Sequence, residues 1–291
     1  MLKKCLKYDL RAVGRIWWIL AASMTAASLV VALCIRALVE TTWNIGFGED
    51  ASALEVIVTL FGGAGAVLGF IAMVACMTVS LILVYWRTYT HFYTDEGYLT
   101  FTLPVKRSTL YLSKVITAAL VEISTTLLFI LGIALILLVA PPAEDGSLIN
   151  PIVYTGLWEL LTEAWKLVGG WLLLWVAVIL PLPILLTLFT SGMTMLCITV
   201  GAVVAKKHKL LAAIGIYYGV TTVLSFVGQL IMTFLSSGVV GIFGLAFTAG
   251  MTPAGLTVTA VILIGGAVTA CLAATLHFIT VHMVEHKLNL A

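Results

Sequence analysis

The sequence predicts an all-α membrane protein that crosses the bilayer six times. Of its 291 residues, 62% are hydrophobic and only 10% are charged, whereas soluble domains carry about 25% charged residues. The apolar residues form six runs, each long enough for the roughly 20-residue helix that spans a hydrocarbon core. Most charged residues lie between these runs or near the ends of the chain.

The chain begins with a predicted amphipathic helix at the membrane surface, residues 2–15. Its leucines fall on one face and its lysines and arginines on the other, an arrangement suited to anionic headgroups. Asp9 lies within the apolar face, so we expect it to contact protein. The predicted spans follow from the lengths of the apolar runs; they are residues 16–38, 56–86, 115–140, 167–205, 210–235 and 254–284.

The interval between the second and third spans is more than a connecting loop. Within residues 91–104, Phe92, Leu99 and Leu103 follow helical spacing, and Pro104 ends the pattern. We therefore expect a short cytoplasmic helix that exposes acidic and aromatic side chains. Such a helix is suited to docking into a cleft of another protein.

Two other intervals and one span need their own interpretation. We predict that residues 151–166 form an interfacial helix on the outer side, because this stretch contains tryptophans, which favour the headgroup level of a bilayer. Residues 236–253 are apolar and rich in glycine but too short to span. We expect a re-entrant hairpin or an outer-leaflet helix there, since irregular backbone cannot face lipid.

The fourth span should kink at Pro181 and Pro183, which each remove a backbone donor.

Small residues predict where helices approach closely. Gly65 with Gly69, and Gly215 with Gly219, have the four-residue spacing of helix-packing motifs. The five cysteines lie in apolar runs or in the basic first segment. They indicate small core residues and not a disulfide framework.

The distribution of charge predicts the orientation in the membrane. Under six crossings, thirteen of the fifteen lysines and arginines fall on the side of the N-terminus, and eight of the thirteen acids fall on the other. The positive-inside rule then places both termini in the cytoplasm.

The sequence contains one enzyme-like pattern, His282, Glu285 and His286, which matches HxxEH. Two histidines at i and i+4 share a helix face, as zinc ligands do. This stretch, however, is the last turn of the final helix, and the sequence indicates neither a further ligand nor a cleft. We expect no metal site and no enzyme. The basic residues lie at membrane edges, where lipid accounts for them, so we also expect no nucleic-acid partner.

Glu122 is the one acid placed clearly within an apolar span. An ionisable group at such depth tends to face the bundle interior or a partner, and His277 lies at a similar depth in the sixth span. Two interpretations stay open. Glu122 and His277 form a polar pair in a pathway, or Glu122 is hydrated near the inner mouth beside Ser124 and Thr125.

The interval after the second span reads Asp95-Glu96-Gly97-Tyr98-Leu99-Thr100-Phe101-Thr102-Leu103-Pro104-Val105, followed by Lys106 or Arg107 and later by Ser113-Lys114. In these residues the chain resembles permease subunits of ABC transporters of the type-two class. The order of its predicted elements is similar as well. The resemblance covers the whole chain in topology but only about 25 residues in motif.

The resemblance implies that residues 91–104 are a coupling helix seated in a groove of a separate ATPase subunit. The residues implied in docking are Phe92, Asp95, Glu96, Gly97, Tyr98 and Leu99, with Asp9 and Arg11 in a secondary role. ATP and Mg²⁺ would bind the partner chain, since no GxxxxGK[ST] loop is present here. A second permease subunit, identical or different, would complete the transport unit.

The resemblance further implies an exporter of a hydrophobic or amphipathic cargo, such as a peptide, drug or lipid, in the bacterial cytoplasmic membrane. The chain differs from some members in having no large extracellular domain. The alternative is a stand-alone secondary transporter or a membrane assembly factor that has no ATPase partner.

Overall fold

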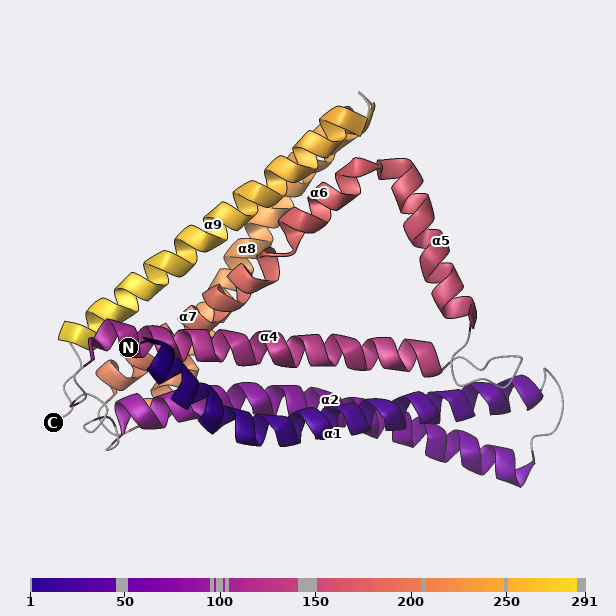
Figure 1. The fold of residues 1–291 in the computed structure, drawn as a ribbon, viewed down its shortest axis with the longest axis horizontal. Coiled ribbons are helices and arrows are strands. Elements are labelled where there is room, and N and C mark those ends of the chain that lie inside the picture. Colours follow the sequence, from indigo (N-terminus) through magenta and orange to yellow (C-terminus); the bar gives the residue numbers. More distant parts are fainter. Residues whose placement is uncertain are drawn as a thin grey trace. The chain divides into compact units, whose positions relative to one another are not determined.

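The structure, a computed structural model, describes residues 2–45, 52–94, 97, 102, 105–140, 151–205, 208–248 and 251–286. The regular structure of these residues is helical throughout (Figure 1). The helices are α1 (Leu2–Ile45), α2 (Ala53–Tyr93), α4 (Arg107–Val139), α5 (Pro151–Val168), α6 (Gly170–Ile179), α7 (Leu182–Val204), α8 (Lys209–Thr248) and α9 (Met251–His286).

Within the described residues, six stretches are helical, long and apolar enough to cross a membrane: Leu2–Thr41, Ala53–Tyr93, Arg107–Val139, Gly170–Val204, Lys209–Leu230 and Gly255–Glu285. Large apolar side chains point outward from them; Phe61, for example, is 75% exposed and Phe278 is 72% exposed. Such surfaces are costly in water and ordinary in lipid. The described part of the chain is therefore all-helical and contains six candidate spans, the arrangement of a multi-pass membrane protein.

The first and fifth spans differ from their expected boundaries. Helix α1 runs without a break through the predicted boundary at residue 15, because the sequence there contains no proline and only one glycine, Gly14. Helix α8 continues to Thr248, so its described part contains no hairpin within 236–253. Continuing the helix keeps the backbone donors paired, which an irregular hairpin in lipid would not do. Placement of this end in the outer leaflet stays a prediction.

The fourth predicted span is divided at two points. Gly169 separates α5 from α6 with φ 58° and ψ −135°, a conformation that glycine adopts at little cost. Leu180 and Pro181 separate α6 from α7. Pro183 follows in the first turn of α7, where its missing N–H costs little. The interruption lies where the prolines predict a kink. The break at Gly169 lies three residues after the predicted end of the helix 151–166, which the structure shows as α5.

By their contacts the residues form two compact units, which are described separately. The first unit comprises Met1–Asp9, Tyr85–Ala119 and Val168–Ala291. The second unit comprises Leu10–Val84 and Leu120–Leu167. The chain on either side of the predicted coupling helix therefore belongs to the same unit as α6 to α9.

The core of the second unit is formed by α1, α2 and α4 around Met24, Val31 and Met73. A Cβ at Gly65 would lie 2.7 Å from Cys34 Sγ, and one at Gly69 would lie 2.5 Å from Val31 Cγ2. The close approach predicted for these two glycines is confirmed. It brings α2 against α1.

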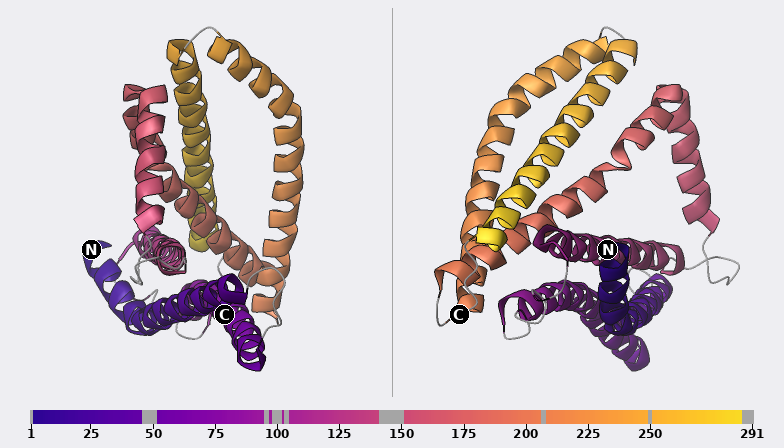
Figure 2. Two further views of the ribbon diagram at one scale, coloured as in Figure 1. Left: turned by 90° about the vertical axis from the view of Figure 1, so that its right-hand side faces the viewer. Right: turned by 60° about the vertical axis from the view of Figure 1, so that its left-hand side comes forward.

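In the first unit, α7, α8 and α9 pack against one another (Figure 2). The close approach of α7 to α8 is at Gly201, where a Cβ would lie 2.6 Å from the backbone of Ala213. A Cβ at Gly215 or Gly219 would meet nothing within 4 Å. The packing role predicted for Gly215 and Gly219 is therefore wrong within the described chain, because α8 contacts α7 through its buried Ala213 face.

Candidate docking segment between α2 and α4

The candidate site is the segment that joins α2 to α4, from Thr94 to Lys106. Four of its predicted docking residues lie outside the described residues: Asp95, Glu96, Tyr98 and Leu99. Their role in docking stays a prediction. The structure does describe both flanks of the segment and, inside it, Gly97, Thr102 and Val105.

Phe92 and Gly97 are both buried, and each has a role within the chain. Phe92 is only 1% exposed and packs edge-on against Tyr93, with ring centroids 6.1 Å apart. Its assignment to an exposed docking face is wrong, because the last turn of α2 turns this ring inward. Gly97 donates its N–H to the Thr94 carbonyl at 2.8 Å. A Cβ there would lie 2.6 Å from the Phe92 carbonyl oxygen, so the turn requires a glycine.

The first flank is held by a buried hydrogen bond between α2 and α7. Tyr93 Oη lies 2.6 Å from Thr199 Oγ1, and the two residues are 5% and 0% exposed. Thr199 uses its single hydroxyl proton to donate to the Met195 carbonyl at 2.8 Å. Tyr93 must therefore be the donor to Thr199. The last residue of α2 is thus bonded to a helix more than 100 residues further along the chain.

The second flank is held by Arg107, the first residue of α4. Its Nη1 atom donates to the carbonyls of Val284 and Glu285, each at 3.3 Å. These carbonyls belong to the last described turn of α9. A guanidinium at this position also suits the negative end of the helix dipole. The start of α4 is therefore bonded to the end of α9.

A third contact lies two turns into α4. Lys114 Nζ lies 2.5 Å from Asp9 Oδ1, and the Ser113 hydroxyl lies 3.1 Å from Asp9 Oδ2. Lys114 is 8% exposed and Ser113 is fully buried. The expectation that Asp9 contacts protein is confirmed. Its carboxylate is engaged within the chain, and its secondary role in docking an ATPase stays a prediction.

The other predicted polar residues are placed as follows. Arg11 is exposed, and its docking role stays a prediction. His277 lies in the first unit, with its ring centroid 5.3 Å from that of the buried Tyr111. Glu122 lies in the second unit and is partly buried. Since the two residues belong to different units, their pairing stays a prediction.

The HxxEH pattern lies in the last turns of α9. Among the residues that the structure describes, no three histidine, cysteine or acidic side chains lie close enough to hold a metal ion. His282 is exposed at the end of α9, and the neighbouring Val284 is buried. The backbone carbonyls of Val284 and Glu285 in this turn accept hydrogen bonds from Arg107.

No family model matches the sequence, and no curated protein or solved structure is similar to it at a significant level. The interpretation of the segment therefore depends on its own geometry. Three polar contacts, at Tyr93, Arg107 and Lys114, link its flanks to α7, to α9 and to the N-terminal turns of α1. Sequence reasoning identified Asp9 but missed these partners, because each pair is separated by more than 100 residues.

Proposed function

We propose that the chain is the permease subunit of an ATP-driven exporter, with the segment between α2 and α4 as the part that receives force from an ATPase. The observation that carries the proposal is the bonding of both flanks of this segment. Tyr93 is bonded to α7 and Arg107 to α9. A displacement of the segment would therefore be passed to two candidate spans far away in the sequence.

The mechanism requires a separate chain for ATP chemistry. The sequence holds no phosphate-binding GxxxxGK[ST] loop, so ATP and Mg²⁺ would bind two partner ATPase subunits. Their closure on ATP would push Asp95 and Glu96 of each permease subunit. The spans would then rock between inward-facing and outward-facing states, as in other rigid-body transitions. Two permease subunits, identical or different, would form the pathway in a bacterial cytoplasmic membrane, with all termini in the cytoplasm.

The class of cargo is supported by the composition of the spans. Ionisable side chains within membrane helices commonly mark ion pathways and proton relays. Here the predicted spans contain few such groups, chiefly Arg36, Glu122 and His277. A pathway lined mainly by apolar side chains favours a hydrophobic or amphipathic cargo, such as a peptide, drug or lipid.

The test is the double variant Asp95→Ala with Glu96→Ala in the full-length chain. The permease is co-expressed with the ATPase encoded nearest to it and purified by a tag on the permease. We expect the variant to fold but to co-purify less ATPase, because two charged contacts are lost from the docking surface. ATP hydrolysis by the complex is then measured in lipid nanodiscs.

A matched control removes an acidic pair elsewhere. Glu159 and Glu163 are exposed on α5, which we expect on the opposite side of the membrane. Their replacement by alanine makes the same change of charge and should leave ATPase co-purification intact. Equal co-purification and equal ATP hydrolysis for wild type, Asp95/Glu96 variant and control would contradict the docking role.

A further inference from the structure

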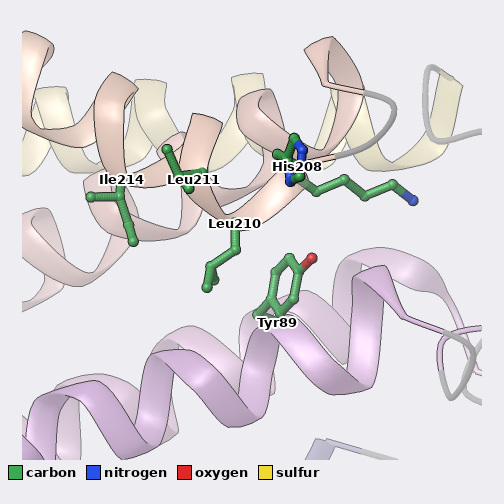
Figure 3. A pocket seen from close by; sticks show the side chains of 6 residues that line it. Tyr89, His208, Leu210, Leu211 and Ile214 are labelled. Carbon is green, nitrogen blue, oxygen red and sulfur yellow. The ribbon is translucent and has the colours of Figure 1, made fainter.

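Apart from the docking segment, the first unit contains a cavity of about 320 Å³ between the end of α2 and the start of α8. The described residues that line it are Tyr89, His208, Lys209, Leu210, Leu211 and Ile214. Figure 3 shows Tyr89 and Leu210 facing each other from the two helices, with the Tyr89 hydroxyl on the side of His208. The cavity thus has a polar end and an apolar end.

Two candidate spans end at this cavity. Tyr89 lies one turn before the end of the span Ala53–Tyr93, and Lys209 is the first residue of the span Lys209–Leu230. The rings of Tyr89 and Trp86 lie next to each other, with centroids 6.2 Å apart and their planes tilted by 43°. Trp86 is 53% exposed. Exposed aromatic rings at the end of a span are typical of the headgroup level of a bilayer. The cavity therefore lies where lipid headgroups are found.

The lining suits a molecule that is anionic at one end and apolar at the other. Lys209 offers an ammonium with three donors, and the His208 ring can donate an N–H. None of the described lining residues is acidic. Leu211 and Ile214, which are 72% and 49% exposed, continue the apolar end along α8. Basic pockets between membrane helices on the cytoplasmic side bind the headgroups of anionic lipids.

We propose that this cavity binds the phosphate of an anionic phospholipid through Lys209 and His208, with an acyl chain lying along Leu211 and Ile214. This site is distinct from the docking segment and does not depend on the chain being a transporter. From the sequence alone, lipid headgroups account for the basic residues at the membrane edges in general, without a defined site. Here a particular cavity, formed by two helices, selects the lipid by its charge.

The test measures lipid binding to the full-length protein by native mass spectrometry. The protein is purified in a neutral detergent and titrated with phosphatidylglycerol or with phosphatidylcholine. We expect tighter binding of phosphatidylglycerol. Lys209→Gln should weaken its binding by about fivefold, the effect of one lysine close to an anionic surface. It should leave the binding of phosphatidylcholine unchanged, and Lys209→Arg should retain the affinity of the wild type.

The matched control is Lys106→Gln, which removes an exposed lysine that lies outside both the cavity and the basic face of residues 2–15 and, by the predicted topology, on the same side of the membrane. We expect it to change phosphatidylglycerol binding by less than twofold. Equal binding of the two lipids by the wild type would overturn the proposal. An equal loss in Lys209→Gln and Lys106→Gln would also overturn it, because that result indicates diffuse attraction. Displacement of the lipid by millimolar inorganic phosphate would show a site for free phosphate instead.

Discussion

The contact between Asp9 and Lys114 offers a direct measurement of how firmly the N-terminal turns are held to α4. Asp9→Asn keeps an oxygen that can accept from Ser113 but removes the charge opposite the Lys114 ammonium. The side chains of Lys114 and Asp9 are only 9% and 15% exposed. Breaking a buried pair by removing one partner costs about 3 to 5 kcal/mol. The residual exposure favours the lower end, about 3 kcal/mol.

A double-mutant cycle separates this pair from other effects of the substitutions. The cycle uses Asp9→Asn, Lys114→Met and the variant that carries both. We expect the double variant to cost less than the two single variants together, because it leaves no buried charge without a partner. A coupling free energy of about 2 kcal/mol or more is expected for groups in direct contact. The free energy of unfolding is measured in mixed micelles by titration with a denaturing detergent.

The control pair belongs to the same chain. Arg36 Nε lies 2.9 Å from Glu40 Oε1 one turn away on α1, and the Glu40 side chain is 47% exposed. The Arg36 side chain is 13% exposed, so the pair is open to solvent on the Glu40 side only. Surface pairs at this spacing are worth about 0.3 to 0.5 kcal/mol, and we expect a value near this range here. The reasoning is refuted if the coupling of Asp9 with Lys114 is no larger than that of Arg36 with Glu40. In that case water or lipid headgroups satisfy Lys114 as well as Asp9 does.

Three further predictions concern single positions. Gly169→Ala should lower the free energy of unfolding by about 1 to 3 kcal/mol. The cause is backbone strain alone, since a Cβ there meets nothing within 4 Å. The control Gly170→Ala, at a helical position, should not lower the free energy of unfolding in the same detergent titration. Gly201→Ala should lower the midpoint temperature of thermal unfolding, because its Cβ would lie 2.6 Å from the backbone of α8. Gly215→Ala should leave this midpoint unchanged. Equal midpoints for the two variants would contradict the packing of α7 on α8. Tyr93→Phe should lower the free energy of unfolding by about 1 kcal/mol. It should also weaken the coupling of ATP hydrolysis to transport while ATPase co-purification stays intact. Unaltered coupling would argue against force passing through α7.

The helices and their number of crossings could be predicted because they depend on local properties. Apolar runs of about 20 residues and the scarcity of charge determine where a chain can span lipid. Boundaries were less predictable. The basic residues between Lys3 and Arg15 indicate an interface but carry no stop signal, so α1 passes straight through them. The predicted boundary after residue 166 lies three residues before the break at Gly169, where a glycine often ends a helix.

The contacts of the candidate site could be predicted only in part. Asp9 could be identified from the sequence because an acidic side chain on an apolar helix face needs a partner. The residues near Asp9 in the sequence, however, do not indicate that Lys114 is that partner. Phe92 shows the opposite case. Its helical spacing is compatible with an exposed face or a buried one, and only the packing of the last turn of α2 decides for burial. The glycine pairs show the same limit, since Gly65 and Gly215 have the same spacing and opposite surroundings.

The chemistry of the three flanking contacts bears on how a push on the segment would be transmitted. A neutral hydrogen bond contributes about 1 kcal/mol and one that involves a charged group about 1.5 to 3 kcal/mol. The bond of Tyr93 is neutral, whereas those of Arg107 and Lys114 involve charged groups. Each contact therefore exceeds the thermal energy, so small displacements would move the bonded helices together.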